Sequence, residues 1–225
     1  MIRTVRKILL LTGKDLRIEA RTRQTLGLVV MLGILIIVVL GLGLGAEQKI
    51  PGFIATAILW VAYLFGGVLC FEKTMAVERH DGALAGLLAA PIDRGIIFAG
   101  KLLSNLILML ALAAVVTPVA IVLFNFDLSA APWGFVAVTA LSMFGFASVG
   151  TLFAGAVSSS RLQGGLLAIL VFPICLPLVI TSTQILIGLF RDGEALGAQG
   201  LGILVAFDAV YLIVSWLVFE RILEP

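Results

Sequence analysis

Residues 24–46 read QTLGLVVMLGILIIVVLGLGLGA, and no side chain in this stretch carries a charge. A run of roughly 18 or more such residues is typical of a helix that crosses the hydrocarbon core of a lipid bilayer. Four more long uncharged stretches follow, at 50–71, 102–126, 128–160 and 162–190. Together these stretches predict an all-α integral membrane protein.

The composition of the whole chain agrees with this interpretation. Of its 225 residues, 61% are hydrophobic and 12% are charged, whereas soluble domains carry about 25% charged residues. A last apolar segment, 201–218, contains one acid, Asp208, and is still long enough to span. We therefore expect a single transmembrane domain, residues 26–218, with six spans at about 26–44, 53–71, 102–124, 135–157, 166–190 and 201–218.

The positions of the basic residues predict how the spans are oriented. Six spans place both termini on the same side of the membrane. Only two of the fifteen Lys and Arg residues, Lys49 and Arg191, fall on the opposite side; the others lie in 1–25, 72–101, 158–165 and the tail 219–225. Because cytoplasmic segments are enriched in Lys and Arg, both termini and the 72–101 loop are expected to be cytoplasmic.

The N-terminal segment, residues 1–25, has the pattern of an amphipathic helix. It carries seven Lys and Arg residues, while Ile2, Val5, Leu9 and Leu16 recur at helical spacing. Such a helix lies in the headgroup plane with its apolar face toward the acyl chains. Gly13 interrupts the apolar stripe, so a solvated basic tail is the alternative.

The spans lack the residue patterns of a membrane-embedded enzyme. None contains an HExxH motif, a GxSxG motif or a pair of carboxylates, and the only histidine, His80, falls in the loop. Gly13-Lys14 lacks the flanking residues of a phosphate-binding loop, so we expect no ATP hydrolysis by this chain. Cys70 and Cys175 are expected to be buried thiols. We predict a non-catalytic chain with no bound metal or cofactor of its own and no nucleic-acid partner.

Two features inside the spans are candidates for a transport role. Pro173 and Pro177 each remove an intrahelical hydrogen bond, so the fifth span is expected to be kinked or locally unwound near mid-bilayer. The kink either borders a substrate path or is only structural. Asp208 is an ionisable residue inside a span and is a candidate coupling acid. Its alternatives are a structural hydrogen-bonded group or a position near the membrane surface.

The 72–101 loop contains the most informative segment, residues 72–91. Glu72, Met75 and Arg79 are expected to continue the second span as a helix into the cytosol, and Asp81 and Gly82 break that helix. A short helix follows, with an apolar face made by Leu84, Leu87 and Leu88 and an end before Pro91. A helix of this kind at the membrane surface is suited to docking a soluble partner; a simple turn back into the membrane is the alternative.

These residues resemble a known signature. The pattern ERxxGALxxLLxxP at 78–91, followed by Lys101, is similar to that of ABC-2 type permeases, which are six-span subunits. Three further features point to one family among these permeases: Pro51-Gly52 before the second span, the chain length, and the sequence ILVFPICLPL at 169–178. Together they resemble CcmB, the haem exporter protein B family of the cytochrome c maturation system.

The resemblance implies a bacterial inner-membrane permease that works with other subunits. Residues Glu78 to Pro91 would dock on a separate cytoplasmic ATPase, CcmA-like, which binds ATP and Mg²⁺. A tryptophan-rich CcmC-like subunit would hold haem, with a small CcmD-like subunit and a second copy of the chain as further partners. Haem is then the expected cargo, released to a periplasmic haem chaperone.

Two other functions remain open at this point. The first is an ABC-2 type exporter of another amphipathic substrate, such as a lipid-linked glycan or a drug. The second is a carrier or scaffold that does not depend on ATP, with Asp208 as its coupling acid.

Overall fold

A computed structural model of the chain describes residues 2–45, 51–80, 86, 92–125, 128, 129, 131–158, 165–191 and 197–222. Within these residues the protein is all helical, as the sequence predicts. The helices are α1 (Ile2–Thr22), α2 (Gln24–Gly43), α3 (Gly52–His80), α5 (Arg94–Phe124), α6 (Pro132–Ser158), α7 (Leu166–Arg191) and α8 (Ala198–Ile222).

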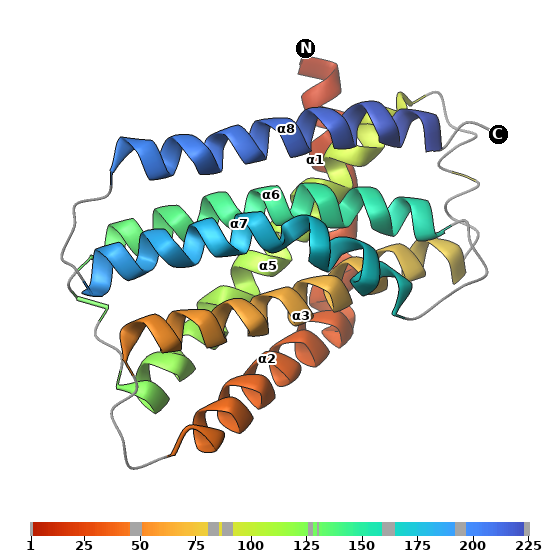
Figure 1. Cartoon of the computed structure of the whole chain (residues 1–225). Helices are drawn as coiled ribbons and strands as arrows, with labels where there is room; N and C mark the ends of the chain where they lie inside the picture. The colour runs from red at the N-terminus through yellow and green to blue at the C-terminus, as the bar shows by residue number, and fades with distance from the viewer. Residues whose placement is uncertain are drawn as a thin grey trace.

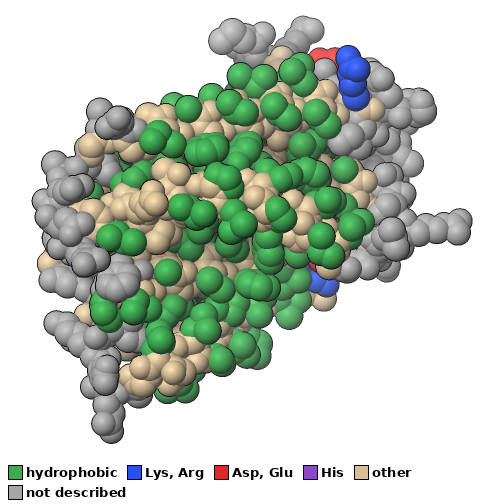
Figure 2. All heavy atoms as spheres, viewed as in Figure 1, with side chains coloured by type: hydrophobic (Ala, Val, Ile, Leu, Met, Phe, Trp, Pro, Cys, Tyr) green, Lys and Arg blue, Asp and Glu red, His purple; other side chains and the backbone are tan. Residues whose placement is uncertain are grey.

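Six of these helices, α2, α3 and α5 to α8, are long and apolar enough to cross a membrane, which confirms the predicted number of spans. The face of the molecule in Figure 2 is mostly hydrophobic, and the few charged side chains visible on it gather toward one end. A surface of this kind is stable in lipid because it exposes almost no charge to the acyl chains.

The helix α1 has a different direction from the spans. In Figure 1 the six spans run side by side, and α1 runs across them in the half of the bundle that contains the last turns of α3, α6 and α8. We call this the α1 end. The last turns of α3, α6 and α8 and the first turns of α2, α5 and α7 lie there. Both described ends of the chain are therefore on the same side, as six spans require.

The centre of the bundle is α6, the most buried of the spans, which packs against α3, α5, α7 and α8. Small residues allow this close packing. A side chain at Gly150 would clash with the ring of Phe71, and one at Gly155 would meet Phe219. These two glycines thus bring α6 close to α3 and α8.

One helix differs from its predicted bounds, and another takes one of its two predicted shapes. The helix α5 begins at Arg94 and not near residue 102, so the end of the 72–101 loop forms its first two turns. The helix α7 stays helical through Pro173 and Pro177, without local unwinding, and bends near its middle (Figure 1). The short helix predicted around residues 84–88 falls almost wholly outside the described residues.

The connection between α1 and α2 is a single residue, Arg23, whose φ of 51° is left-handed. This conformation turns the chain sharply from α1 into the first span. The Glu19 carboxylate accepts a hydrogen bond of 2.6 Å from the Leu26 backbone N–H. An acid at this place satisfies a first-turn N–H of α2 and complements the positive end of its dipole.

The close packing of α6 can be tested with one added methyl group. Gly150→Ala should lower the stability of the protein by about 1–3 kcal/mol, because the new Cβ would overlap the buried Phe71 ring. The measurement is the thermal unfolding midpoint of the purified chain in detergent. Gly202→Ala is the matched control, since a Cβ there has no neighbour within 4 Å. Equal midpoints for the two variants would refute the packing.

Candidate functional site

The predicted docking element connects α3 to α5 at the α1 end of the bundle. Glu78 and Arg79 lie in the last turn of α3, as expected, but their side chains are outside the described part of the structure. The remaining residues of the motif lie wholly outside the described part of the chain, namely Gly82, Leu84, Leu87, Leu88 and Pro91. The described residues define how the two helices that carry the element are held.

A chain of hydrogen-bonded side chains, two of them buried and one partly buried, connects α3, α5 and α6. The Thr74 hydroxyl of α3 donates a hydrogen bond of 2.8 Å to the Asn105 Oδ1 atom of α5. The Asn105 Nδ2 group donates in turn to the Thr151 Oγ1 atom of α6, at 2.9 Å. Asn105 and Thr151 are fully buried. In a low-dielectric interior such bonds fix the register of three helices, because breaking them leaves polar groups unsatisfied.

An ion pair connects α1 to α5. The Lys101 Nζ atom lies 2.9 Å from an Asp15 carboxylate oxygen, and the two side chains are only 7% and 10% exposed. Ser104 donates a hydrogen bond to the same carboxylate. The Thr12 hydroxyl donates to the Gly100 carbonyl oxygen. The missing side chain of Gly100 makes this approach possible, since a Cβ there would lie 2.9 Å from Leu11 Cβ.

These two groups of contacts are adjacent. A cavity of about 20 Å³ lies between them, lined by Asp15, Ile18, Glu19, Thr25, Thr74 and Leu108. It has room for about one water molecule. We call the seven side chains that make the two sets of contacts the base cluster: Thr12, Asp15, Thr74, Lys101, Ser104, Asn105 and Thr151. The base cluster joins α1, α3, α5 and α6, and two of these helices, α3 and α5, flank the predicted docking element in the chain.

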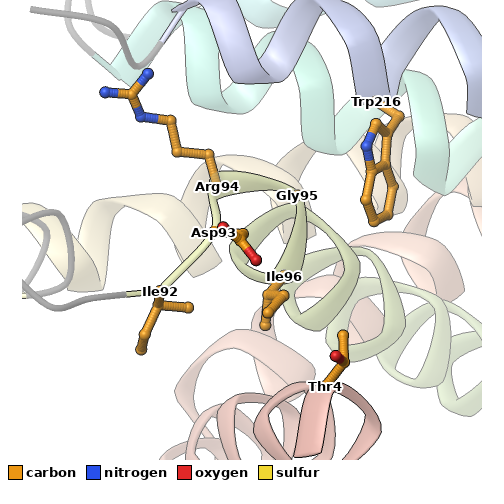
Figure 3. A pocket seen from close by; sticks show the side chains of 7 residues that line it. All are labelled: Thr4, Ile92, Asp93, Arg94, Gly95, Ile96 and Trp216. Atoms are coloured by element: carbon orange, nitrogen blue, oxygen red, sulfur yellow. The ribbon is translucent and has the colours of Figure 1, made fainter. Parts of the chain in front are cut away.

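An open hollow of about 510 Å³ lies where the chain re-enters the bundle from the loop. Figure 3 shows its walls: Thr4 from α1, residues 92–96 at the start of α5, and Trp216 from α8. The first turns of α5 are also held to α8 by ring contacts of Phe98 with Trp216 and Phe219. The start of α5 therefore touches both α1 and the last span.

The intramembrane candidates lie apart from the base cluster, between α6, α7 and α8. Asp208 of α8 is buried against α6, where its carboxylate and Leu178 of α7 both crowd the position of a Gly145 side chain. Leu178 follows Pro177 directly. The Tyr211 hydroxyl of α8 donates a hydrogen bond of 2.6 Å to the Ile174 carbonyl oxygen, on the turn before Pro177. The structure thus brings Asp208 and the bend in α7 together, which the sequence did not predict.

Most of the base cluster was missed by reasoning from sequence. Lys101 belongs to the family signature and Asp15 follows Gly13-Lys14, but neither pattern indicates that the two side chains pair. A signal does exist: Asp15 and Glu19 are the only acids in residues 1–25, and they lie four positions apart on one helix face. Among the described residues, no group of three His, Cys, Asp or Glu side chains could hold a metal ion.

The ion pair can be tested by removing its buried cation. Lys101→Met should destabilise the chain by about 3 kcal/mol, because it leaves the Asp15 carboxylate buried without its closest partner. Adding Asp15→Asn should restore part of that loss. The measurement is the thermal unfolding midpoint in detergent.

Lys14→Met is the matched control for this test. Lys14 contacts the same carboxylate at 3.4 Å, but its side chain is 39% exposed. Its loss should cost at most about 1 kcal/mol, as for other exposed ion pairs. If Lys14→Met and Lys101→Met shift the midpoint equally, the buried pair does not hold α1 to α5.

Comparison with known proteins agrees with the fold and the signature. The family model described as CcmB protein matches residues 6–224. A protein named Heme exporter protein B from Paracoccus denitrificans is 29% identical over 204 residues, which are 88% of this chain and 88% of that protein. The protein of the same name from Rhodobacter capsulatus is 29% identical over 201 residues, covering 86% and 84% of the two chains. A third, from Bradyrhizobium diazoefficiens, is 25% identical over 206 residues and 91% of each chain. The chain is a multi-pass membrane protein that belongs to the CcmB family.

Proposed function

We propose that this chain is the permease subunit of an ATP-driven haem exporter and receives the motion of a separate ATPase through residues 78–91. Its relatives are named Heme exporter protein B, and they match this chain over most of its length. The membrane is the bacterial inner membrane, with both termini and the docking element in the cytoplasm. The basic residues of α1 support this orientation.

The observation that carries the proposal is the base cluster. Movement of a docking element can tilt the spans only if the helices on both sides of the element stay together. Here α3 and α5 are bonded to each other through Thr74 and Asn105, and α5 is bonded to α1 through Lys101 and Asp15. A displacement of the element would therefore move these helices together, and Asn105 would pass it to α6 through Thr151.

In this mechanism the chain itself hydrolyses no ATP. Closure of a CcmA-like ATPase, which binds ATP and Mg²⁺, would push the docking element, and the base cluster would convert that push into a tilt of the spans. Haem is the proposed cargo. A tryptophan-rich CcmC-like subunit would hold it, with a small CcmD-like subunit and a second copy of the chain completing the complex, and a periplasmic chaperone would receive it.

The docking element is tested by placing a charge on its predicted apolar face. Leu87→Glu should abolish co-purification with the cognate ATPase, because a carboxylate would have to be buried in an apolar contact. Leu84→Glu and Leu88→Glu should behave in the same way. The measurement is the amount of ATPase that co-purifies with the tagged chain in mild detergent.

The control places the same charge on the opposite face of the same segment. Gly86 is exposed and lies about 160° around a helix from the face of the three leucines. Gly86→Glu should leave the complex intact. The docking element is not at these leucines if the ATPase still co-purifies with all three leucine variants.

The cargo needs a separate observation, because a lipid-linked glycan or drug exporter could use the same docking element. The subunits that co-purify with the wild-type chain distinguish the two functions. Haem-handling subunits, together with haem absorbance in the purified complex, would support haem export. Glycan-processing partners and a complex free of haem would contradict it.

A further inference from the structure

Asp208 is an acid in the middle of the last span, and its position there is unusual. Its side chain is 7% exposed, and its Oδ1 atom is buried without a hydrogen-bond partner. The other buried residues of α8, Leu204, Ser215 and Phe219, continue the same stripe toward α6. The carboxyl group therefore lies inside the contact between α8 and the bundle and not at its edge.

The carboxyl group occupies the space on α6 that the missing side chain of Gly145 leaves open. Any side chain at Gly145 would overlap the Asp208 Oδ1 atom, so only a glycine leaves room for the acid. Leu178 of α7 closes the same place from a second side. Apolar and backbone atoms therefore surround most of this group.

No described side chain supplies a positive charge to this group. The sequence of α6 contains no charged residue, and the one of α7, Arg191, is at its end. On α8 the other charged residues, Glu220 and Arg221, are likewise at the end. The titratable groups on the adjacent helices are Cys175, which is buried, and Tyr211, whose hydroxyl bonds to Ile174. On α5, which also contacts α8, Lys101 is paired with Asp15, and Arg94 is the first residue of the helix, in the wall of the open hollow.

From this geometry we infer that Asp208 is a proton-binding site inside the membrane. An ionised carboxylate without a cation is strongly disfavoured in such surroundings. The group holds its proton while α8 is closed against Gly145. Separation of α8 from α6 would admit water, and the carboxyl would then release the proton to it and become a carboxylate. The contact between α6 and α8 would thus open more readily at high pH.

The site lies beside the bend in α7, which gives it a mechanical role. Tyr211, one turn after Asp208, bonds to the α7 carbonyl just before Pro177. A movement of α8 that exposes Asp208 would therefore also pull on the weakest part of α7. Protonation of Asp208 involves this chain alone and does not depend on the ATPase or on haem.

The test is infrared spectroscopy of the full chain in lipid nanodiscs near neutral pH. Wild type should show the carbonyl stretch of a protonated carboxylic acid, and Asp208→Asn should lose it. The isosteric amide keeps the shape of the side chain, and size-exclusion chromatography checks that the variant is folded. Asp15→Asn is the control, because its parent carboxylate is paired with Lys101 and should contribute no such band.

A second measurement identifies the protonated carboxyl group by chemical labelling. Dicyclohexylcarbodiimide, which is lipid-soluble, reacts with protonated carboxyl groups in apolar surroundings. Mass spectrometry should find it on Asp208, and labelling should fall as pH rises. Identical carboxylic acid bands in wild type and Asp208→Asn would overturn the proposal. So would a band that is present in the isolated chain and absent from the assembled complex, because a partner's cation would then have replaced the proton.

Discussion

A polar group inside a bilayer has no water to bond with, and this constraint decides which helices of the protein are fixed to one another. In the described residues, α1 and α5 share the Asp15–Lys101 pair, and α3, α5 and α6 share the Thr74–Asn105–Thr151 chain. Each of these groups would be left unsatisfied if its helices separated. These contacts join the helices α3 and α5 that flank, in the chain, the segment that enters the cytoplasm in our proposal.

The rest of the bundle has further polar contacts, such as the buried Ser142–Ser182 hydrogen bond between α6 and α7, but no described ion pair. Toward α8 the contacts include glycine notches filled by side chains from the neighbouring helix, as at Gly155 with Phe219. Such contacts cost less to open than a buried ion pair, because they leave no unpaired charge. Asp208 is the exception within this region, and a proton removes its charge. The molecule thus combines a base joined by buried polar contacts with a last span that packs extensively on α6 and has no described ion pair.

The sequence predicted the parts of the fold that depend on local pattern. Uncharged stretches identified the six spans, and the basic amphipathic segment identified α1. The start of α5 was placed too late because Lys101 was treated as a loop residue, whereas its charge is buried against α1. Asp15 and Ser104 are 89 positions apart, and nothing in either segment alone indicates that they meet. The proximity of Asp208 to the bend in α7 also could not be predicted, because it arises from packing between helices that are separate in the sequence.

The central claim is that α1 and α5 move as one unit when the docking element is displaced. Pulsed electron paramagnetic resonance tests it most directly, with spin labels at Leu10 of α1 and Val122 of α5. Both positions are exposed, and the buried native Cys70 and Cys175 would be replaced by alanine. In the complex with its ATPase, the distance between the labels should stay the same when nucleotide is added. A change in that distance in the otherwise wild-type chain would contradict the account.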